Sequence, residues 1–464
     1  MSRRSNRHSA TNAAGKSKNR SPRRGLHSDA DYDAAPMFEA RIDRLNDRGE
    51  GVATICTDNK AEIAEAQITV PYTAAGDLVR LRHIDGHGRL ISVLEAGPDR
   101  RTPACPLFGD CGGCSFQHLT SNAEDQWKEE LVEHALAREG VNCPPNPRAP
   151  RLPIAARRRV TVSAERRGDG FVLGFKAKRS HRLVPLTTCL VLAPALFQLT
   201  QRLPALLARL PAQWSALTVK VTHCANGFDL DLTNSSAAMS DVMVDEARAV
   251  EALARAARDL NILRIAINGE TVMVHEDPIV VFDRIPVAMP PGAFLQASVE
   301  GQASLIRLVM DALGSVGLKS GDYVADLFSG CGTFTLPMAR HYQVYAADND
   351  APGIAALTQA HRQQQGLKPV KAEVRDLYRQ PLMADELARF AAIVMDPPRA
   401  GAPAQVKALA SSPSSRLVYV SCNPKSFARD ARLLASGGFA LKNIALVDQF
   451  AHSPHVELVG VFAR

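Results

Sequence analysis

The chain has 464 residues, of which 46% are hydrophobic and 22% are charged, and it carries a formal net charge of +7. This length gives room for about two to four domains, and no apolar run approaches the roughly 20 residues that span a bilayer. The nine cysteines are irregularly spaced and no apolar segment follows the first residues. We therefore expect a cytoplasmic protein whose cysteines are thiols, metal ligands or catalytic groups rather than disulfides.

Basic residues are concentrated at the start of the chain. Residues 1–35 contain eight Lys or Arg against three Asp. This segment has too little apolar surface to fold, so we predict a disordered basic tail over residues 1–36. Such a tail suits attraction to a phosphate backbone, and a solvated tail that merely aids solubility is an alternative.

Short segments of alternating apolar residues, separated by turn residues, follow over residues 37–97. Five expected strands in this stretch predict a small barrel of the oligonucleotide-binding type. Residues 45–53 and 71–81 resemble the TRAM domain of RNA-modifying enzymes, and Arg80, Arg82 and Arg89 favour contact with RNA. The expected strands are 40–45, 49–55, 68–71, 77–82 and 88–93.

Residues 98–290 read as a mixed α+β region that contains a cluster of cysteines. Cys105, Cys111 and Cys114 lie close together with two glycines between the last two, and Cys189 follows later. Four thiolates satisfy either a tetrahedral zinc ion or a [4Fe-4S] cluster, and three close cysteines with one distant partner favour iron. We predict a structural metal site at these four cysteines. The expected helices are 123–138 and 241–260, and the expected strands are 160–164, 171–175, 216–222 and 227–232.

From residue 291 to residue 464 strands and helices alternate, which is typical of a doubly wound, mostly parallel sheet. The run from Asp326 to Gly332 follows a strand and opens a helix, so its glycines permit close approach of a ligand. Asp348 ends the next strand, in position to bind ribose hydroxyls, and Asp376 follows a third strand, within reach of an adenine amino group. This succession resembles class I S-adenosylmethionine (SAM)-dependent methyltransferases. The expected strands are 323–328, 343–348, 370–374, 391–396, 416–421, 440–449 and 457–462.

Cys422, in the run Ser-Cys-Asn-Pro, comes directly after an expected strand at the sheet edge that holds ligands in such folds. Carbon 5 of uracil needs a nucleophile at carbon 6 before it can attack a methyl donor, and a cysteine thiolate, partly formed at neutral pH, suits this role. Glu457 is a candidate base for the proton on carbon 5. Cys331 is the rival thiol, and we interpret it as a packing residue.

The runs Asp-Pro-Pro-Arg, Ser-Cys-Asn-Pro and His-Val-Glu together resemble the RNA uridine-5 methyltransferase family over residues 37–464. The resemblance implies that Cys422 is the nucleophile and Glu457 the base. It further implies cofactor contacts and, for one aromatic residue, contact with the target base. The implied cofactor residues are Gln296, Phe328, Thr333 and Asp396, and the implied base-contacting residue is Phe294.

Family members with a barrel and four cysteines resemble the 23S rRNA branch, so we expect a monomeric 23S rRNA uridine-5 methyltransferase that uses SAM and binds a [4Fe-4S] cluster. Methylation of tRNA uridine or of cytosine at carbon 5 is an alternative. A noncatalytic RNA-binding assembly factor and a cluster-dependent redox role are alternatives of other classes. The expected organisation is a tail (1–36), a barrel (37–97), a middle domain (98–290) and a class I, Rossmann-like methyltransferase domain (291–464).

Overall fold

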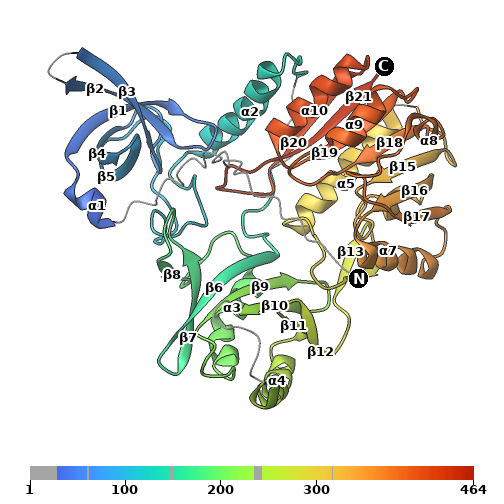
Figure 1. Ribbon diagram of the computed structural model, residues 1–464, viewed down its shortest axis with the longest axis horizontal. Helices are drawn as coiled ribbons and strands as arrows, with labels where there is room; N and C mark the ends of the chain where they lie inside the picture. Colours follow the sequence, from blue (N-terminus) through green and yellow to red (C-terminus); the bar gives the residue numbers. More distant parts are fainter. Residues whose placement is uncertain (1–28, 60–61, 146–150, 235–242, 316) are drawn as a thin grey trace, which may run out of the picture.

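The computed structural model describes residues 29–59, 62–145, 151–234, 243–315 and 317–464, so most of the predicted basic tail, up to residue 28, lies outside the described residues. The end of that tail forms the short helix α1 (Asp29–Ala34), where the sequence predicted disorder. In the described ranges no helix is long and apolar enough to cross a membrane. The described residues form three large sheets, which lie in three separate regions of the molecule (Figure 1), and one two-stranded hairpin.

The first sheet is a closed five-stranded barrel with the strand order β1-β2-β3-β5-β4, which confirms the predicted barrel. Alternate side chains, such as Ile42, Val79 and Leu81, are buried inside it, as expected for strands with one face in a core. The strands are β1 (Met37–Leu45), β2 (Gly51–Asn59), β3 (Glu62–Val70), β4 (Leu78–Ile84) and β5 (His87–Glu95).

The second sheet has seven strands in the order β12-β11-β10-β9-β6-β7-β8. The sequence predicted four of these strands and one of the two helices, and it missed the helix that contains Pro204, a residue that usually breaks helices. The strands are β6 (Arg159–Arg167), β7 (Gly170–Lys176), β8 (Leu183–Pro185), β9 (Ala216–His223), β10 (Phe228–Asn234), β11 (Ile262–Ile267) and β12 (Glu270–Val274). The helices are α3 (Pro194–Leu207) and α4 (Met243–Arg258).

The third sheet has the order β17-β16-β15-β18-β19-β21-β20, with the first five strands parallel and β21 antiparallel to both neighbours. This is the predicted doubly wound methyltransferase sheet. Its strands are β15 (Tyr323–Leu327), β16 (Gln343–Asp348), β17 (Val370–Val374), β18 (Ala392–Met395), β19 (Arg416–Ser421), β20 (Ala440–Val447) and β21 (Glu457–Ala463). Its helices are α5 (Val299–Ser315), α6 (Thr335–Met338), α7 (Ala351–Gln363), α8 (Ala384–Leu387), α9 (Pro403–Ala410) and α10 (Pro424–Ser436).

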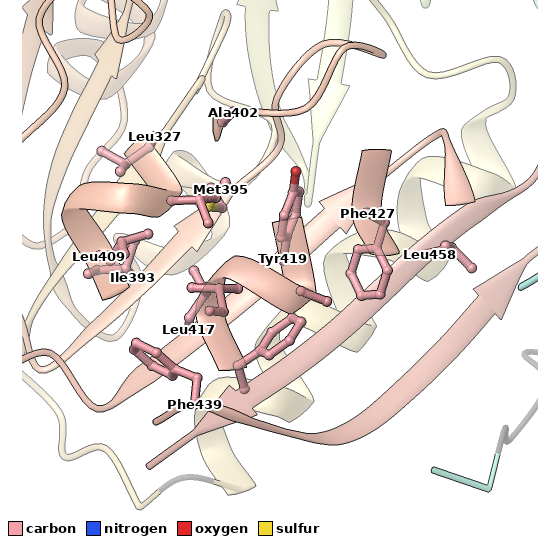
Figure 2. Packing of buried hydrophobic residues seen from close by; sticks show 14 of the residues in the cluster. Leu327, Ile393, Met395, Ala402, Leu409, Leu417, Tyr419, Phe427, Phe439 and Leu458 are labelled. Atoms are coloured by element: carbon pink, nitrogen blue, oxygen red, sulfur yellow. The ribbon is translucent and has the colours of Figure 1, made fainter. Parts of the chain in front are cut away.

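Side chains on both faces of this third sheet are buried. Ile393 and Tyr419 lie in the cluster under α9 and α10, with Phe427 packed against Tyr419 (Figure 2). The alternate residues Val394 and Val418 face the other way, into the cluster that includes α5. Burial on both faces explains why these strands read as continuous apolar runs rather than alternating ones.

Two elements that precede residue 291 pack against helices that cover the third sheet. Helix α2 (Ser121–Arg138) lies beside α10, and Leu136 is buried in the same cluster as Phe427 (Figure 1). The hairpin of β13 (Ile279–Phe282) and β14 (Ile285–Ala288) packs on α7. The sequence predicted the helix but not the hairpin, and it assigned the residues of both to the middle region, because only contacts between distant parts of the chain decide where they pack.

Candidate active site

The candidate active site lies at the carboxyl edge of the third sheet. Asp396 follows β18 and Cys422 follows β19 at this edge. Because β21 runs antiparallel to β19, its first residue lies at the same edge, and the strand register pairs Ser421 with Leu458. Cys422 and Glu457, which are 35 positions apart in the sequence, are therefore neighbours across two adjacent strands.

Local sequence holds Cys422 at the junction between β19 and α10. The side chain of Asn423 caps α10 by accepting a hydrogen bond from the backbone N of Lys425 (3.2 Å), and Pro424 is the first helical residue. Asn423 Nδ2 also donates to the backbone oxygen of Arg399 (3.0 Å), which fixes the loop after β18 to the same junction. The thiol thus lies on a turn that is fixed both by the cap of α10 and by the loop after β18.

The thiol of Cys422 is half-buried, and its surroundings favour the protonated form. Burial, followed by the negative charges of Glu457 and Asp396, raises the pKa of Cys422 to about 11, whereas Arg399 acts in the opposite direction. This corrects the expectation of a partly formed thiolate at neutral pH. The sulfur must lose its proton as it reacts.

Two carboxyl groups beside this thiol have pKa values near neutrality. Burial, with a smaller contribution from Asp396, raises the pKa of Glu457 to about 8, and Gln449 partly offsets this by hydrogen bonding. Burial of the carboxyl group and the charge of Asp348 raise the pKa of Asp396 to about 7. Acids whose pKa lies near working pH can accept and return protons, as general base catalysis requires.

The glycine-containing loop after β15 is shaped by its backbone and by Asp348. Phe328 has a φ of 65°, which is unusual for a residue with a side chain, and Gly330 has a φ of 52°. Asp348 accepts hydrogen bonds from the backbone N of Gly330 (2.8 Å) and of Asp350 (2.9 Å). A Cβ atom added at Gly330 would meet nothing within 4 Å, so the loop faces open space.

This loop also presents polar atoms without partners. Among the described residues, Ser329 Oγ and Asp326 Oδ1 are buried and have no hydrogen-bond partner. Asp326 accepts a hydrogen bond from Thr335 through its other oxygen, and burial raises its pKa to about 7. Buried polar atoms normally find partners, so these two fit a polar ligand at the loop. Thr333 is half-buried in the following turn.

Asp376 follows β17 and is half-buried. Its Oδ1 accepts hydrogen bonds from the backbone N of Tyr378 (3.0 Å) and of Arg379 (3.2 Å), so it caps its own turn. The ring of Phe328 lies against the ring of Tyr378, with 5.7 Å between the centroids. The loops after β15 and β17 are thus in contact, although no hydrogen bond links Asp376 to the glycine loop in the described part of the chain.

The segment before α5 supplies the other two predicted side chains. Gln296 is buried and accepts a hydrogen bond from Gln449 Nε2 (2.7 Å). Phe294 is 69% exposed, and the guanidinium carbon of Arg159 lies 5.4 Å from its ring centroid. An exposed aromatic ring beside a cation is suited to stacking on a nucleobase.

Sequence reasoning missed Gln449 and Ser329. Gln449 donates a hydrogen bond to Gln296 and lowers the pKa of the Glu457 carboxyl group, so it links two predicted site residues. The only signal available was its place in the polar segment that leads to Glu457. Cys331, by contrast, is buried among apolar side chains, which agrees with its interpretation as a packing residue.

The four predicted metal-binding cysteines line one pocket, together with the guanidinium group of Arg157. All four thiols are free and half-buried. Burial raises the pKa of Cys114 to about 11, and the other cysteines of the pocket add to this. Across the described ranges, no three His, Cys, Asp or Glu side chains converge as ligands of a single metal ion. The apolar lining residues are Leu107, Phe108, Phe175, Leu186, Leu190, Val191 and Leu192.

Comparisons with known proteins agree with this fold. A relative in Caulobacter vibrioides, named an uncharacterized RNA methyltransferase, is 39% identical over 92% of this chain and 100% of its own length. The 23S rRNA (uracil(1939)-C(5))-methyltransferase of Chromohalobacter salexigens is 30% identical over 91% of this chain and 88% of its own length.

A solved structure shares the fold. The crystal structure of Pyrococcus abyssi tRNA (uracil-54, C5)-methyltransferase in complex with S-adenosyl-L-homocysteine matches with a TM-score of 0.66 and 22% identity, over 92% of this chain and 99% of that one. The tRNA (uracil-5-)-methyltransferase family matches residues 231–464, which include the glycine loop after β15, Cys422 and Glu457. This chain therefore belongs to the tRNA (uracil-5-)-methyltransferase family of RNA-modifying enzymes.

Proposed function

We propose that this enzyme methylates carbon 5 of a uridine in 23S rRNA with SAM as the methyl donor, acting as a monomer in the cytoplasm. The observation that carries the proposal is the placement of Cys422 and Glu457 as neighbours at the carboxyl edge of the third sheet. The choice of 23S rRNA is supported by the relative from Chromohalobacter salexigens, which is named for that substrate.

The reaction begins with a covalent bond between enzyme and uracil. The sulfur of Cys422 adds to carbon 6 and loses its proton to a neighbouring carboxylate other than Glu457, for which Asp396 is the candidate, while the electrons of the ring double bond move toward the carbonyl oxygen at carbon 4. Carbon 5, now nucleophilic, takes the methyl group. Glu457 then removes the remaining proton from carbon 5, the ring double bond re-forms, and the bond between sulfur and carbon 6 breaks.

The residues around the glycine loop fit the methyl donor. SAM, when bound, supplies a methyl group on a positively charged sulfur. We propose that Asp348 binds its ribose and that the buried Asp396 lies at its junction with the base. The unpartnered Ser329 Oγ and the open space at Gly330 support a ligand at this loop. The remaining proposed contacts are Gln296, Phe328, Thr333 and Asp376.

The target uridine must leave its stack to reach this edge, because Cys422 is half-buried. Phe294 is the proposed stacking partner, since its ring is largely exposed and lies beside Arg159. A stacked base there would gain both an aromatic and a cationic neighbour.

We propose that the RNA backbone follows a basic groove between the barrel (37–97) and the loop after β7 in the middle region (98–290), and that the target nucleotide also contacts the catalytic region (291–464). Cationic and aromatic side chains line this groove, the combination that tracks a phosphate backbone. The cationic lining residues are Arg48, Arg89, Arg100, Lys178, Arg179 and Arg182, and the aromatic ones include Tyr72 and Phe108.

We propose that Cys105, Cys111, Cys114 and Cys189 hold a [4Fe-4S] cluster with a structural role. The four thiols of one pocket match the ligand set of such a cluster, the apolar lining would shield it, and Arg157 would offset the negative charge of the thiolates. A single zinc ion is the alternative for the same four ligands.

The test is covalent trapping with RNA that contains 5-fluorouridine. Fluorine cannot be removed as a proton, so the methylated adduct on Cys422 should persist through denaturing electrophoresis. The adduct should form with the wild type and with Cys143→Ser, a variant of another half-buried cysteine, and should not form with Cys422→Ala. RNA binding without adduct or methyl transfer by the wild type would favour a noncatalytic assembly factor.

Identification of the modified nucleotide tests the substrate. RNA from a deletion strain should lack 5-methyluridine at one position of 23S rRNA. Loss of a methylated uridine in tRNA, or of 5-methylcytosine, would overturn that part of the proposal and leave the covalent mechanism intact.

A further inference from the structure

Gln449 links the cofactor side of the site to the proposed base. It is 8% exposed and lies between β20 and β21, two residues after the end of β20. Its Oε1 accepts a hydrogen bond from the backbone N of Ala297 (3.1 Å), and its Nε2 donates to Oε1 of Gln296 (2.7 Å). Gln296 and Gln449 are 153 positions apart, so this contact depends on the fold.

The neighbours of this amide determine its orientation. A backbone N–H can only donate, so the atom that faces Ala297 must be the oxygen. The other end is then an NH₂ group with two hydrogens, of which one is directed to Gln296. Glu457 is the neighbouring acceptor: Val447, two residues before Gln449, pairs with Glu457 across β20 and β21, and hydrogen bonding from Gln449 lowers the pKa of that carboxyl group.

Gln449 packs directly against Gly301 of α5. A Cβ atom added at Gly301 would lie 2.6 Å from Gln449 Oε1 and 2.8 Å from its Cβ, both shorter than any normal contact. Residue 301, on α5, must therefore lack a side chain for Gln449 to occupy this position.

We propose that Gln449 is a positioning residue whose single amide group aligns Gln296 toward the methyl donor and holds the carboxylate of Glu457 in place to remove the proton from carbon 5. This inference rests on the proposed function and adds a residue to it. It implies that removal of the Gln449 amide group weakens the binding of SAM and slows the release of methylated RNA.

The pH dependence follows from the groups that face Glu457. Asp396, after β18, raises the pKa of Glu457, and Cys422, after β19, lies beside the same carboxyl group. Arg399 acts on Cys422 and on His455, in the segment before β21. The ionised form of Glu457 is the working form, so the release step should accelerate as pH rises through about 8. Without the N–H group that Gln449 donates, the rising limb of this pH–rate profile should move to higher pH.

The experiment measures single-turnover release of methylated RNA between pH 6 and 10 for the wild type and Gln449→Met. We expect the limb to move upward by about one pH unit, which is a tenfold slower release near neutral pH. Release should recover at high pH, and the methylated adduct should accumulate below the limb. The KM for SAM should also rise.

Gln405→Met is the matched control. Gln405 is fully buried and both ends of its amide bond to the backbone of Leu382, away from the site. The Gln405→Met variant should lower the free energy of unfolding and leave the rising limb of the pH–rate profile where it is in the wild type. Gly301→Ala, which displaces Gln449 without replacing it, should move the limb in the same direction as Gln449→Met.

An unmoved limb in both site variants, or an equal loss of rate at every pH, would overturn the role of Gln449. A wild type that forms no adduct and transfers no methyl group would instead overturn the proposed function. The two failures are therefore distinguishable.

Discussion

The Nζ of Lys128, on α2, donates a hydrogen bond of 2.7 Å to Oδ2 of Asp448, which lies 320 positions further along the chain. The same Nζ donates to Glu124 Oε1 at 2.7 Å, and Glu124 in turn accepts hydrogen bonds from the backbone N and Nδ1 of His452. Burial acts to raise the pKa of Glu124, but His452 and Lys128 outweigh it and lower the value to about 2. This buried network ties α2 to the segment that leads to Glu457.

Replacement of Lys128 by Met should reduce the free energy of unfolding by about 3 kcal/mol, because it leaves buried carboxylates without their cation. Lys128 is only 1% exposed, so water cannot replace its charge. Urea denaturation would measure the change. Arg138→Met, which breaks an exposed ion pair of the same helix with Asp47, is the control and should alter stability much less. Equal effects of the two variants would contradict this account.

Replacement of Glu457 by Gln should trap the reaction after methyl transfer. The amide has nearly the same shape but cannot accept the proton from carbon 5, so turnover should fall by about 10²- to 10⁴-fold. A labelled methyl group should then comigrate with the protein on a denaturing gel, with natural RNA as substrate. Glu373→Gln, on β17, should behave as the wild type. Normal turnover by Glu457→Gln would exclude it as the base.

Replacement of Cys114 by Ser should remove the metal. Anaerobically purified wild type should contain about four iron atoms per chain and absorb visible light, as a [4Fe-4S] cluster does, and Cys114→Ser should have lost both signals. Cys224→Ser, a buried cysteine outside this pocket, should keep them. Zinc in place of iron, measured by elemental analysis, would contradict the cluster and preserve the ligand set.

Replacement of Arg182 by Ala should weaken RNA binding in a salt-dependent manner. Arg182 lines the basic groove, where it pairs with Asp110 at 2.9 Å, and its side chain is 52% exposed, so it can exchange this exposed partner for a phosphate. The slope of log affinity against log salt should fall by about one. Arg255→Ala, an exposed arginine on α4, should leave the slope unchanged. Equal slopes for Arg182→Ala and the wild type would remove this residue from the RNA path.

Sequence patterns were sufficient where function and local structure coincide. Cys422 and Glu457 were singled out from short motifs beside strands, and the strand register brings the two residues together. The barrel was equally predictable, because alternation of apolar residues depends only on the strand itself.

Other features depended on contacts that no local pattern contains. The place of Gln449 arises from residues more than 150 positions away, Gln296 and Ala297. The raised pKa of Cys422 arises mainly from burial and from two acids in other segments of the chain. The ordinary chemistry of cysteine had instead suggested a partly formed thiolate at neutral pH. The packing of α2 on α10 likewise depends on the whole fold.

That packing bears on how the molecule can be dissected. Leu136 and Val132 of α2 complete the apolar layer over α10, and the β13–β14 hairpin completes the layer over α7. A fragment that begins at residue 291 would expose both layers to water and invite aggregation. The region that begins at residue 291 shares part of its interior with residues that precede it, so the two regions are expected to fold and to be expressed as one chain.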